Sequence, residues 1–180
     1  MPPNYVPIEQ CFQGGAVIHP LRCLDATERP YSLLLYQHCG VVEARPDFVG
    51  NADQKLARQK FSAFLQIAQR ENSDLAVCPE YSCPWVTFED ALASGTLPNP
   101  GSMWILGCES VTPEQLYAVR DRNPKVCWIY EDLVHTGGRR FLDPVCHVFW
   151  MTIDDHPRLA VAVQFKCQCI RVAGFKIFCQ

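Results

Sequence analysis

The stretch that decides the fold is residues 73–85, Ser-Asp-Leu-Ala-Val-Cys-Pro-Glu-Tyr-Ser-Cys-Pro-Trp. Its apolar run at 75–78 is typical of a buried strand. Pro79 is expected to stop that strand, because proline has no N–H to donate to a neighbouring strand. Glu80 then lies just past the strand end, where a carboxylate is the first candidate for chemistry in this chain.

The sequence before this stretch predicts a strand and a helix. Residues 31–39 form an apolar run that predicts a strand buried on both faces, and 40–50 is predicted to be a loop. Residues 51–70 repeat apolar side chains at helical spacing, with Asn51 as a suitable N-cap. Strand, helix and strand in this order predict a β-α-β unit with parallel strands. Functional residues gather beyond the carboxyl ends of such strands, where Glu80 is expected.

The sequence after the stretch continues as an α/β chain whose sheet becomes mixed. Thr112-Pro-Glu-Gln is a well-formed helix start, with threonine as cap. The short connection at 154–157 predicts an antiparallel hairpin. After Lys166 no periodicity of apolar residues is clear. The remaining predicted elements are a helix at 84–92 and strands at 103–108, 126–133, 145–153 and 158–165. Residues 1–30 are predicted to be an irregular N-terminal extension, and 31–180 a single domain.

Composition is that of a globular protein. The 180 residues are 48% hydrophobic and 19% charged, with a formal net charge of -3, which gives no electrostatic reason to expect nucleic acid or an anionic membrane as partner. No apolar stretch is long enough to span a bilayer, and residues 1–10 do not have the pattern of a secretory signal. We therefore expect a cytoplasmic protein without a membrane or nucleic-acid partner.

The cysteines are expected to be free thiols. There are eleven, an odd number, and no Cys-x-x-Cys spacing suggests a structural zinc site. The five histidines share no spacing typical of a metal site either. We therefore predict a reducing compartment and no metal or cofactor. The cysteines that lie in apolar runs, where a thiol acts as a small hydrophobe, are Cys39, Cys78, Cys108, Cys127 and Cys146.

Several segments from residue 31 to Lys166 form an ordered set of short motifs. An apolar strand ends in glutamine at 33–37, and Gly-Asn at 50–51 precedes a helix. Asp-Leu, an apolar strand and Pro-Glu follow at 74–80. A later strand ends in glycine at 105–107, and a hairpin ends in Val-Gln-Phe-Lys at 163–166. In this order the segments resemble the N-terminal part of the nitrilase (carbon-nitrogen hydrolase) superfamily. The chain departs from the family pattern at His147, where the family often has asparagine.

This resemblance implies an α-β-β-α sandwich, incomplete in this chain, and a hydrolase acting on nonpeptide C–N bonds of a small amide or nitrile. Glu80 would be the base that takes the thiol proton, and Lys166 would stabilise the developing oxyanion. The family's nucleophilic cysteine follows at a strand-to-helix turn. Only fourteen residues follow Lys166, and Cys167, Cys169 and Cys179 lack that context. We therefore expect the nucleophile to lie outside this chain, and the chain alone to be inactive.

Two other interpretations stay open. The chain could be a non-catalytic assembly module derived from the nitrilase fold, acting as a homo-oligomer or with a partner chain, because half of a sandwich exposes apolar sheet surface. It could also be a small α/β binding domain that resembles the family by accident. The distance between Glu80 and Lys166 distinguishes this last interpretation from the others.

Overall fold

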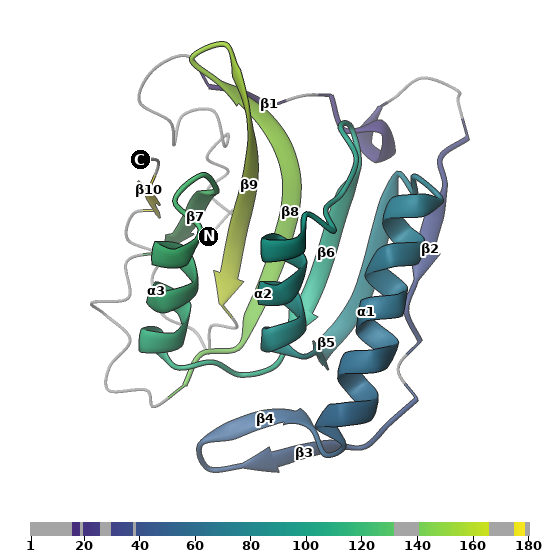
Figure 1. Cartoon of the computed structure of the whole chain (residues 1–180), viewed down its shortest axis with the longest axis vertical. Coiled ribbons are helices and arrows are strands. Elements are labelled where there is room, and N and C mark those ends of the chain that lie inside the picture. The colour runs from purple at the N-terminus through teal and green to yellow at the C-terminus, as the bar shows by residue number, and fades with distance from the viewer. Residues whose placement is uncertain are drawn as a thin grey trace, which may run out of the picture.

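The computed structural model describes residues 16–18, 20–25, 30–37, 39–131, 141–165 and 175–178. Its strands form one mixed sheet in the order β10-β7-β9-β8-β6-β5-β2, with β1 paired to β8, and β3 and β4 form a separate hairpin (Figure 1). The elements are β1 Val17–Ile18, the 3-10 helix η2 Arg22–Leu24, β2 Leu33–Leu35, β3 Val42–Arg45, β4 Phe48–Asn51, α1 Gln54–Arg70, β5 Leu75–Cys83, α2 Trp85–Ser94, β6 Met103–Cys108, α3 Pro113–Arg122, β7 Cys127–Glu131, β8 Pro144–Ile153, β9 His156–Phe165 and β10 Phe175–Phe178.

The predicted β-α-β unit is confirmed. Strand β2 pairs with β5 in parallel, and β5 pairs with β6 in parallel. Strand β8 is antiparallel to both β6 and β9, so the sheet changes from parallel to mixed as expected. The β8–β9 hairpin turns at Asp154 and Asp155, with φ of 49° and 61°, values typical of the tight turn that matches strand twist.

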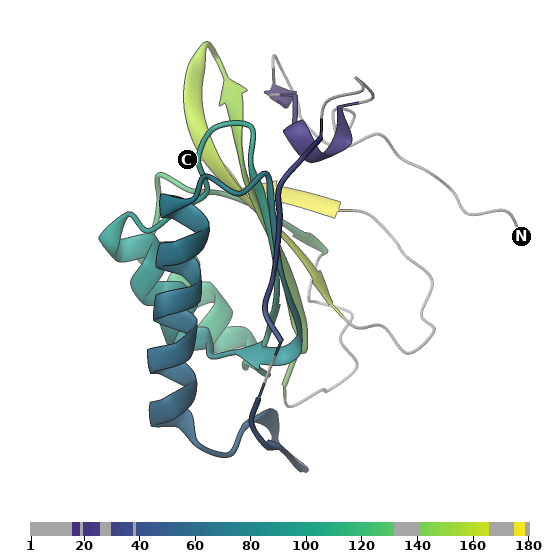
Figure 2. The same ribbon diagram turned by 90° about the vertical axis from the view of Figure 1, so that its right-hand side faces the viewer.

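The helices α1, α2 and α3 pack on one face of the sheet (Figure 2). The core between them and the sheet is built around large side chains with 0–2% exposure, including Phe61 of α1, Phe88 of α2, Trp104 of β6 and Trp128 of β7. Truncation of any of them to alanine would cost about 3–5 kcal/mol. On the opposite face, Ile18 and Leu21 pack against a smaller cluster that contains Met151 of β8. The described part is thus an α/β arrangement, and the complete nitrilase-like sandwich stays a prediction.

Two predictions about the segment before β5 are wrong. Residues 40–50, predicted to be a loop, contain the β3–β4 hairpin, with Arg45 paired to Phe48. Helix α1 is not capped by Asn51, which is the last residue of β4. It begins at Gln54, and the Asp53 side chain accepts a 2.9 Å hydrogen bond from the backbone N–H of Leu56. Charged and turn residues in 40–50 concealed the strands of the hairpin. Asn51 and Asp53 both have short polar side chains that can cap a helix, and the sequence did not distinguish between them.

The strand predicted at 31–39 is shorter than expected and is not buried on both faces. Strand β2 lies at one end of the described sheet order, and Leu33 and Leu35 are 47% and 63% exposed. Cys39 is also exposed, against the prediction of a buried thiol. An apolar run does not reveal whether its strand is central or at an edge. Asp74 fixes the start of β2 to that of β5, because it accepts a 2.8 Å hydrogen bond from Ser32 N–H.

The other elements agree closely with the sequence. Thr112 and Gln115 form the predicted capping box at the start of α3, and β6 has the predicted bounds. Helix α2 ends at Ser94 and is followed by Gly95 as its C-cap, whose φ is 77°. Beyond Lys166, where no pattern was clear, β10 pairs antiparallel with β7. Within the described residues, no helix has the length and apolar content needed to cross a membrane. The division into 1–30 and 31–180 stays a prediction.

Candidate functional site

The predicted Pro-Glu strand end is a large bulge inside β5. Pairing with β6 is regular up to Cys78, which lies opposite Leu106, and resumes at Cys83, opposite Cys108. Residues 79–82, which we call the Pro-Glu bulge, therefore lie opposite Gly107 alone. The strand does not stop at Pro79 as predicted, but continues to Cys83 beyond the bulge. Proline interrupts the hydrogen-bond ladder, and the chain restores the pairing four residues later.

Gly107 is what allows the Pro-Glu bulge to approach β6. A Cβ at position 107 would lie 2.4 Å from the carbonyl oxygen of Pro79 and 2.6 Å from the backbone nitrogen of Glu80. Tyr81 has a φ of 60°, a conformation that costs a non-glycine residue about 1–3 kcal/mol. The Ser82 hydroxyl, which is 1% exposed, donates a 2.5 Å hydrogen bond to the Pro79 carbonyl. Strained backbone of this kind clusters at functional sites.

Glu80 is exposed at the carboxyl edge of the sheet. Strand β9, which leads to Lys166, ends at Phe165 on the same edge, because Phe165 pairs with Pro144 at the start of β8 and β8 is antiparallel to β6. In sheet order, β6 and β8 separate β5 from β9, which puts their backbones about 14 Å apart at the usual strand spacing. Lys166 lies outside the described residues, so its pairing with Glu80 stays a prediction.

A second glutamate at this edge, Glu109, was missed in the sequence. It follows β6 directly and is only 4% exposed. Its Oε1 accepts three hydrogen bonds: 2.6 Å from Asn51 N–H, 2.7 Å from the Asn51 side-chain amide and 2.6 Å from the Gln54 side-chain amide. The Asn51 amide also donates to the Ser82 carbonyl at 2.9 Å. Asn51 therefore joins the Pro-Glu bulge to Glu109.

A cavity of about 640 Å³ opens beside Glu109, between the starts of α1 and α2, helix α3 and the β3–β4 hairpin. Glu80 does not line it. Three carboxylates and three guanidinium groups do, so the charges of the lining balance. The lining residues are Glu43, Arg45, Phe48, Asn51, Ala52, Gln54, Arg58, Trp85, Val86, Glu89, Glu109, Ser110, Gln115, Ala118, Val119 and Arg122.

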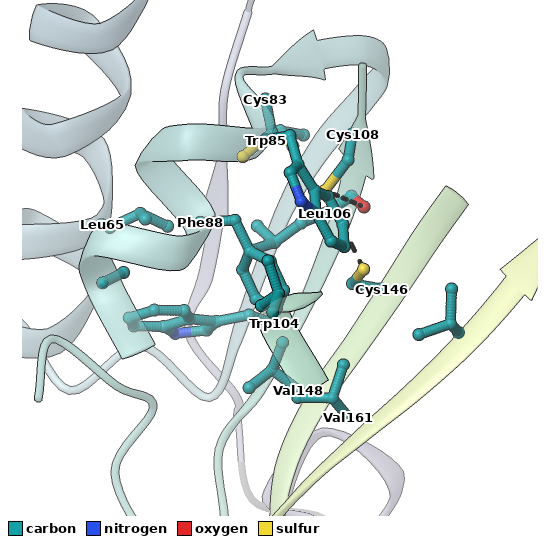
Figure 3. Packing of buried hydrophobic residues seen from close by; sticks show 14 of the residues in the cluster. Leu65, Cys83, Trp85, Phe88, Trp104, Leu106, Cys108, Cys146, Val148 and Val161 are labelled. Carbon is teal, nitrogen blue, oxygen red and sulfur yellow. Dashed lines mark hydrogen bonds between the residues drawn. The ribbon is translucent and has the colours of Figure 1, made fainter. Parts of the chain in front are cut away.

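Buried thiols flank the Pro-Glu bulge: Cys78 and Cys83 lie at its two ends, and Cys108 pairs with Cys83. Cys108 donates from Sγ to the Leu106 carbonyl at 3.5 Å and lies 3.9 Å from Cys146 Sγ (Figure 3). Burial raises the pKa of Cys78 and Cys108 well above its ordinary value, and the hydrogen bond to Cys108 is the largest cause of the raised pKa of Cys83. These thiols are protonated at neutral pH, which makes them poor nucleophiles.

His147 points to the face of the sheet opposite the helices, where its cross-strand neighbours are Ile105 and Ala162. Burial lowers the pKa of its imidazole, although a backbone hydrogen bond with Ala162 acts in the opposite direction. The ring is therefore neutral at pH 7. This agrees with a histidine that contributes to packing.

The sequence signal for Glu109 was the same as that for Glu80. Both follow an apolar strand directly, and parallel neighbouring strands bring their carboxyl ends to one edge. What the sequence did not reveal is that Asn51 and Gln54, from the β4–α1 junction, would converge on this carboxylate. Within the described ranges, no group of three or more His, Cys, Asp and Glu side chains is arranged to hold a metal ion.

Comparison with known proteins adds no relative. No family model, no curated protein and no solved structure matches this chain.

Proposed function

We propose that this chain is a nitrilase-like hydrolase domain that acts on nonpeptide C–N bonds, with Glu80 as the base and Lys166 as the cation that stabilises the oxyanion. The order of its elements supports this proposal: a parallel β2-α1-β5 unit, then β6, then the β8–β9 hairpin that leads to Lys166. The Pro-Glu bulge is the observation that carries it, because strained backbone around a carboxylate at the carboxyl edge of a sheet is expected of a catalytic residue.

In this mechanism Glu80 takes the proton of a cysteine thiol, and the thiolate attacks the carbon of an amide or nitrile. The negative charge that develops on the substrate oxygen or nitrogen faces the Lys166 ammonium. For an amide, the proton held by Glu80 passes to the leaving nitrogen, which departs as ammonia or an amine and leaves a thioester. A nitrile first gives a thioimidate, which adds water and then loses ammonia to give the same thioester. Water then attacks the thioester, with Glu80 again accepting a proton.

The nucleophile is not one of the buried thiols beside the bulge. Their raised pKa and their packing on the helix-covered side of the sheet keep Cys78, Cys83 and Cys108 protonated and out of contact with a substrate. Cys167, Cys169 and Cys179 lie outside the described residues. We assign the nucleophile to a cysteine beyond the described part, in this chain or in a partner chain.

Ammonia release from small aliphatic amides and nitriles tests the proposed activity in the protein as it occurs in its host, with any partner chain retained. We expect Glu80→Gln to reduce the rate at least about 100-fold, as loss of a general base does. Glu114→Gln is the matched control, because Glu114 is exposed at the start of α3. Equal rates for the Glu80→Gln variant and the wild type would exclude Glu80 as the base.

Zero-length carbodiimide cross-linking tests the pairing independently of turnover. It joins a carboxylate to an amine only where the two groups touch, so peptide mass spectrometry should find a Glu80–Lys166 linkage. Lys125 is the control amine, because it lies just before the start of β7, at the sheet edge opposite to that of Glu80. A Glu80–Lys125 linkage with no Glu80–Lys166 linkage would reject the catalytic pair.

A second candidate function is assembly without catalysis. The specific observation is strand β2, which ends the described sheet order and exposes Leu33 and Leu35. Exposed apolar side chains on an edge strand favour pairing with another chain, and a second copy is the simplest partner. Light scattering should then show a dimer that Leu35→Lys converts to a monomer. A monomeric wild-type protein would exclude this candidate.

A further inference from the structure

We propose that the cavity beside Glu109 binds a small molecule with a primary ammonium group, and that Glu109 Oε2 accepts hydrogen bonds from that group. The inference is independent of the proposed hydrolase activity, because Glu80 does not line the cavity.

The first step of the argument is the unequal use of the two Glu109 oxygens. Oε1 accepts three hydrogen bonds of 2.6–2.7 Å from Asn51 and Gln54. Within the described part of the chain, Oε2 accepts none. The amide donors hold the carboxylate in a fixed orientation, so Oε2 is pre-positioned for a further donor.

The second step is the charge. Glu109 is 4% exposed, and among the described residues no cation forms an ion pair with it. A buried carboxylate is costly unless it is paired or fully hydrogen-bonded. The three amide donors are neutral and all contact one oxygen. A ligand cation with several N–H groups supplies both the positive charge and the hydrogen-bond donors for Oε2.

The third step is that the arginines of the cavity are engaged or directed elsewhere. Arg122 forms an ion pair with Glu89. Arg45 lies 5.2 Å from the centre of the Phe48 ring and 4.0 Å from Asp47. Arg58 is exposed on α1. The cavity thus has a buried carboxylate at Glu109 and solvated guanidinium groups elsewhere along its wall.

The fourth step is size and lining. A volume of about 640 Å³ lies within the range of small-molecule sites. Phe48 and Val86, which are partly exposed, give the wall apolar surface, against which a short alkyl chain would pack. An ammonium group on such a chain is the simplest ligand, and the exposed Arg58 allows a carboxylate at the far end.

Three molecules with the same carbon chain test this assignment by calorimetry on the whole protein. These probes are n-butylammonium, γ-aminobutyrate and butanoate, each at millimolar concentration. We expect the two ammonium compounds to bind and butanoate not to bind. Tighter binding of γ-aminobutyrate than of n-butylammonium would support an amino-acid-like ligand, and tighter binding of n-butylammonium would support a simple amine.

Glu109→Gln is the decisive variant. Its side-chain oxygen can keep the three amide donors, whereas its NH₂ group replaces Oε2 and repels an ammonium group. Binding of n-butylammonium should weaken about tenfold or more, as expected for loss of a hydrogen bond to a charged group. Ala118→Leu, which reduces the cavity volume without changing any charge, should also weaken binding. Glu114→Gln, outside the cavity, should not.

Results of two kinds would overturn the proposal. One is that no ammonium probe binds the wild-type protein, or that butanoate binds as well as they do. The other is that Glu109→Gln, with an unchanged melting temperature, binds n-butylammonium as tightly as the wild type, which would mean that the ammonium group lies elsewhere.

Discussion

Replacement of Gly107 by alanine tests the geometry of the Pro-Glu bulge directly. The new Cβ would lie 2.4 Å from the Pro79 carbonyl oxygen and 2.6 Å from both the nitrogen and Cα of Glu80. Real Cβ contacts are essentially never below 3.0 Å, so the Pro79 oxygen must move away by about 0.6 Å and the two Glu80 atoms by about 0.4 Å. They are backbone atoms of a neighbouring strand, which cannot yield as the end of a flexible side chain can.

The expected cost follows from this clash. Overpacking of a buried site costs about 1–3 kcal/mol, and we expect the upper half of that range because backbone must move. For a chain of this length each kcal/mol lowers the melting temperature by about 2–4 °C. Gly107→Ala should therefore melt about 4–12 °C below the wild type in a calorimetric scan, and its urea midpoint should fall accordingly.

Gly95→Ala is the matched comparison. Gly95 has a φ of 77°, but a Cβ there would meet nothing within 4 Å. Only the left-handed conformation is penalised, by about 1 kcal/mol. The prediction thus concerns the order of the two stabilities as well as the size of the loss: the Gly107→Ala variant is less stable than the Gly95→Ala variant. If the two variants were equally stable, or the order reversed, the reasoning about the close approach of β6 to the bulge would be refuted.

Three further predictions concern Glu109, His147 and the free thiols. Glu109→Ala should lower the free energy of unfolding by about 2–5 kcal/mol, because it leaves the buried donors of Asn51 without an acceptor, whereas urea titration should show a much smaller loss for Glu109→Gln. Since burial lowers the folded-state pKa of His147, the unfolded chain binds its proton more readily, so stability should fall as the pH drops below about 6.5. Urea titrations of the wild type and of His147→Gln at several pH values should show a weaker acid dependence in the variant. Brief treatment with iodoacetamide should label Cys39, which is exposed, but leave Cys78 unlabelled, because the latter is buried and its thiol pKa is raised; equal labelling in peptide mass spectrometry would contradict this burial.

Local patterns predicted much of the fold. The capping box at Thr112 and Gln115 is a sequence of adjacent residues, and it forms as expected. Strand β6 is an apolar run that ends in glycine and cysteine, and it has the predicted bounds. Helix α1 was predicted from its apolar spacing, although its start was placed three residues too early. Elements whose signal lies within a few neighbouring residues were thus the most reliable.

Long-range placement could not be predicted in the same way. The leucines of β2 are apolar enough for a central strand, yet β2 ends the described sheet order and exposes them. The β3–β4 hairpin was missed because its residues carry charges and turn signals. Whether a strand is buried depends on which other strands pair with it, and no single stretch of sequence carries that information.

The α/β order and the carboxylate after an apolar strand could be read from the chain alone, because hydrophobic spacing sets the first and the lack of an N–H at Pro79 marks the second. The surroundings of the two glutamates, Glu80 and Glu109, were set by contacts between distant parts of the chain, which the tertiary structure supplies. Strand β5 continues through the Pro-Glu bulge, and Gly107 lies against that bulge. Asn51 and Gln54 both donate hydrogen bonds to one oxygen of Glu109. These contacts join residues at least twenty-five positions apart, and they form only because parallel pairing brings the carboxyl ends of β5 and β6 to one edge of the sheet.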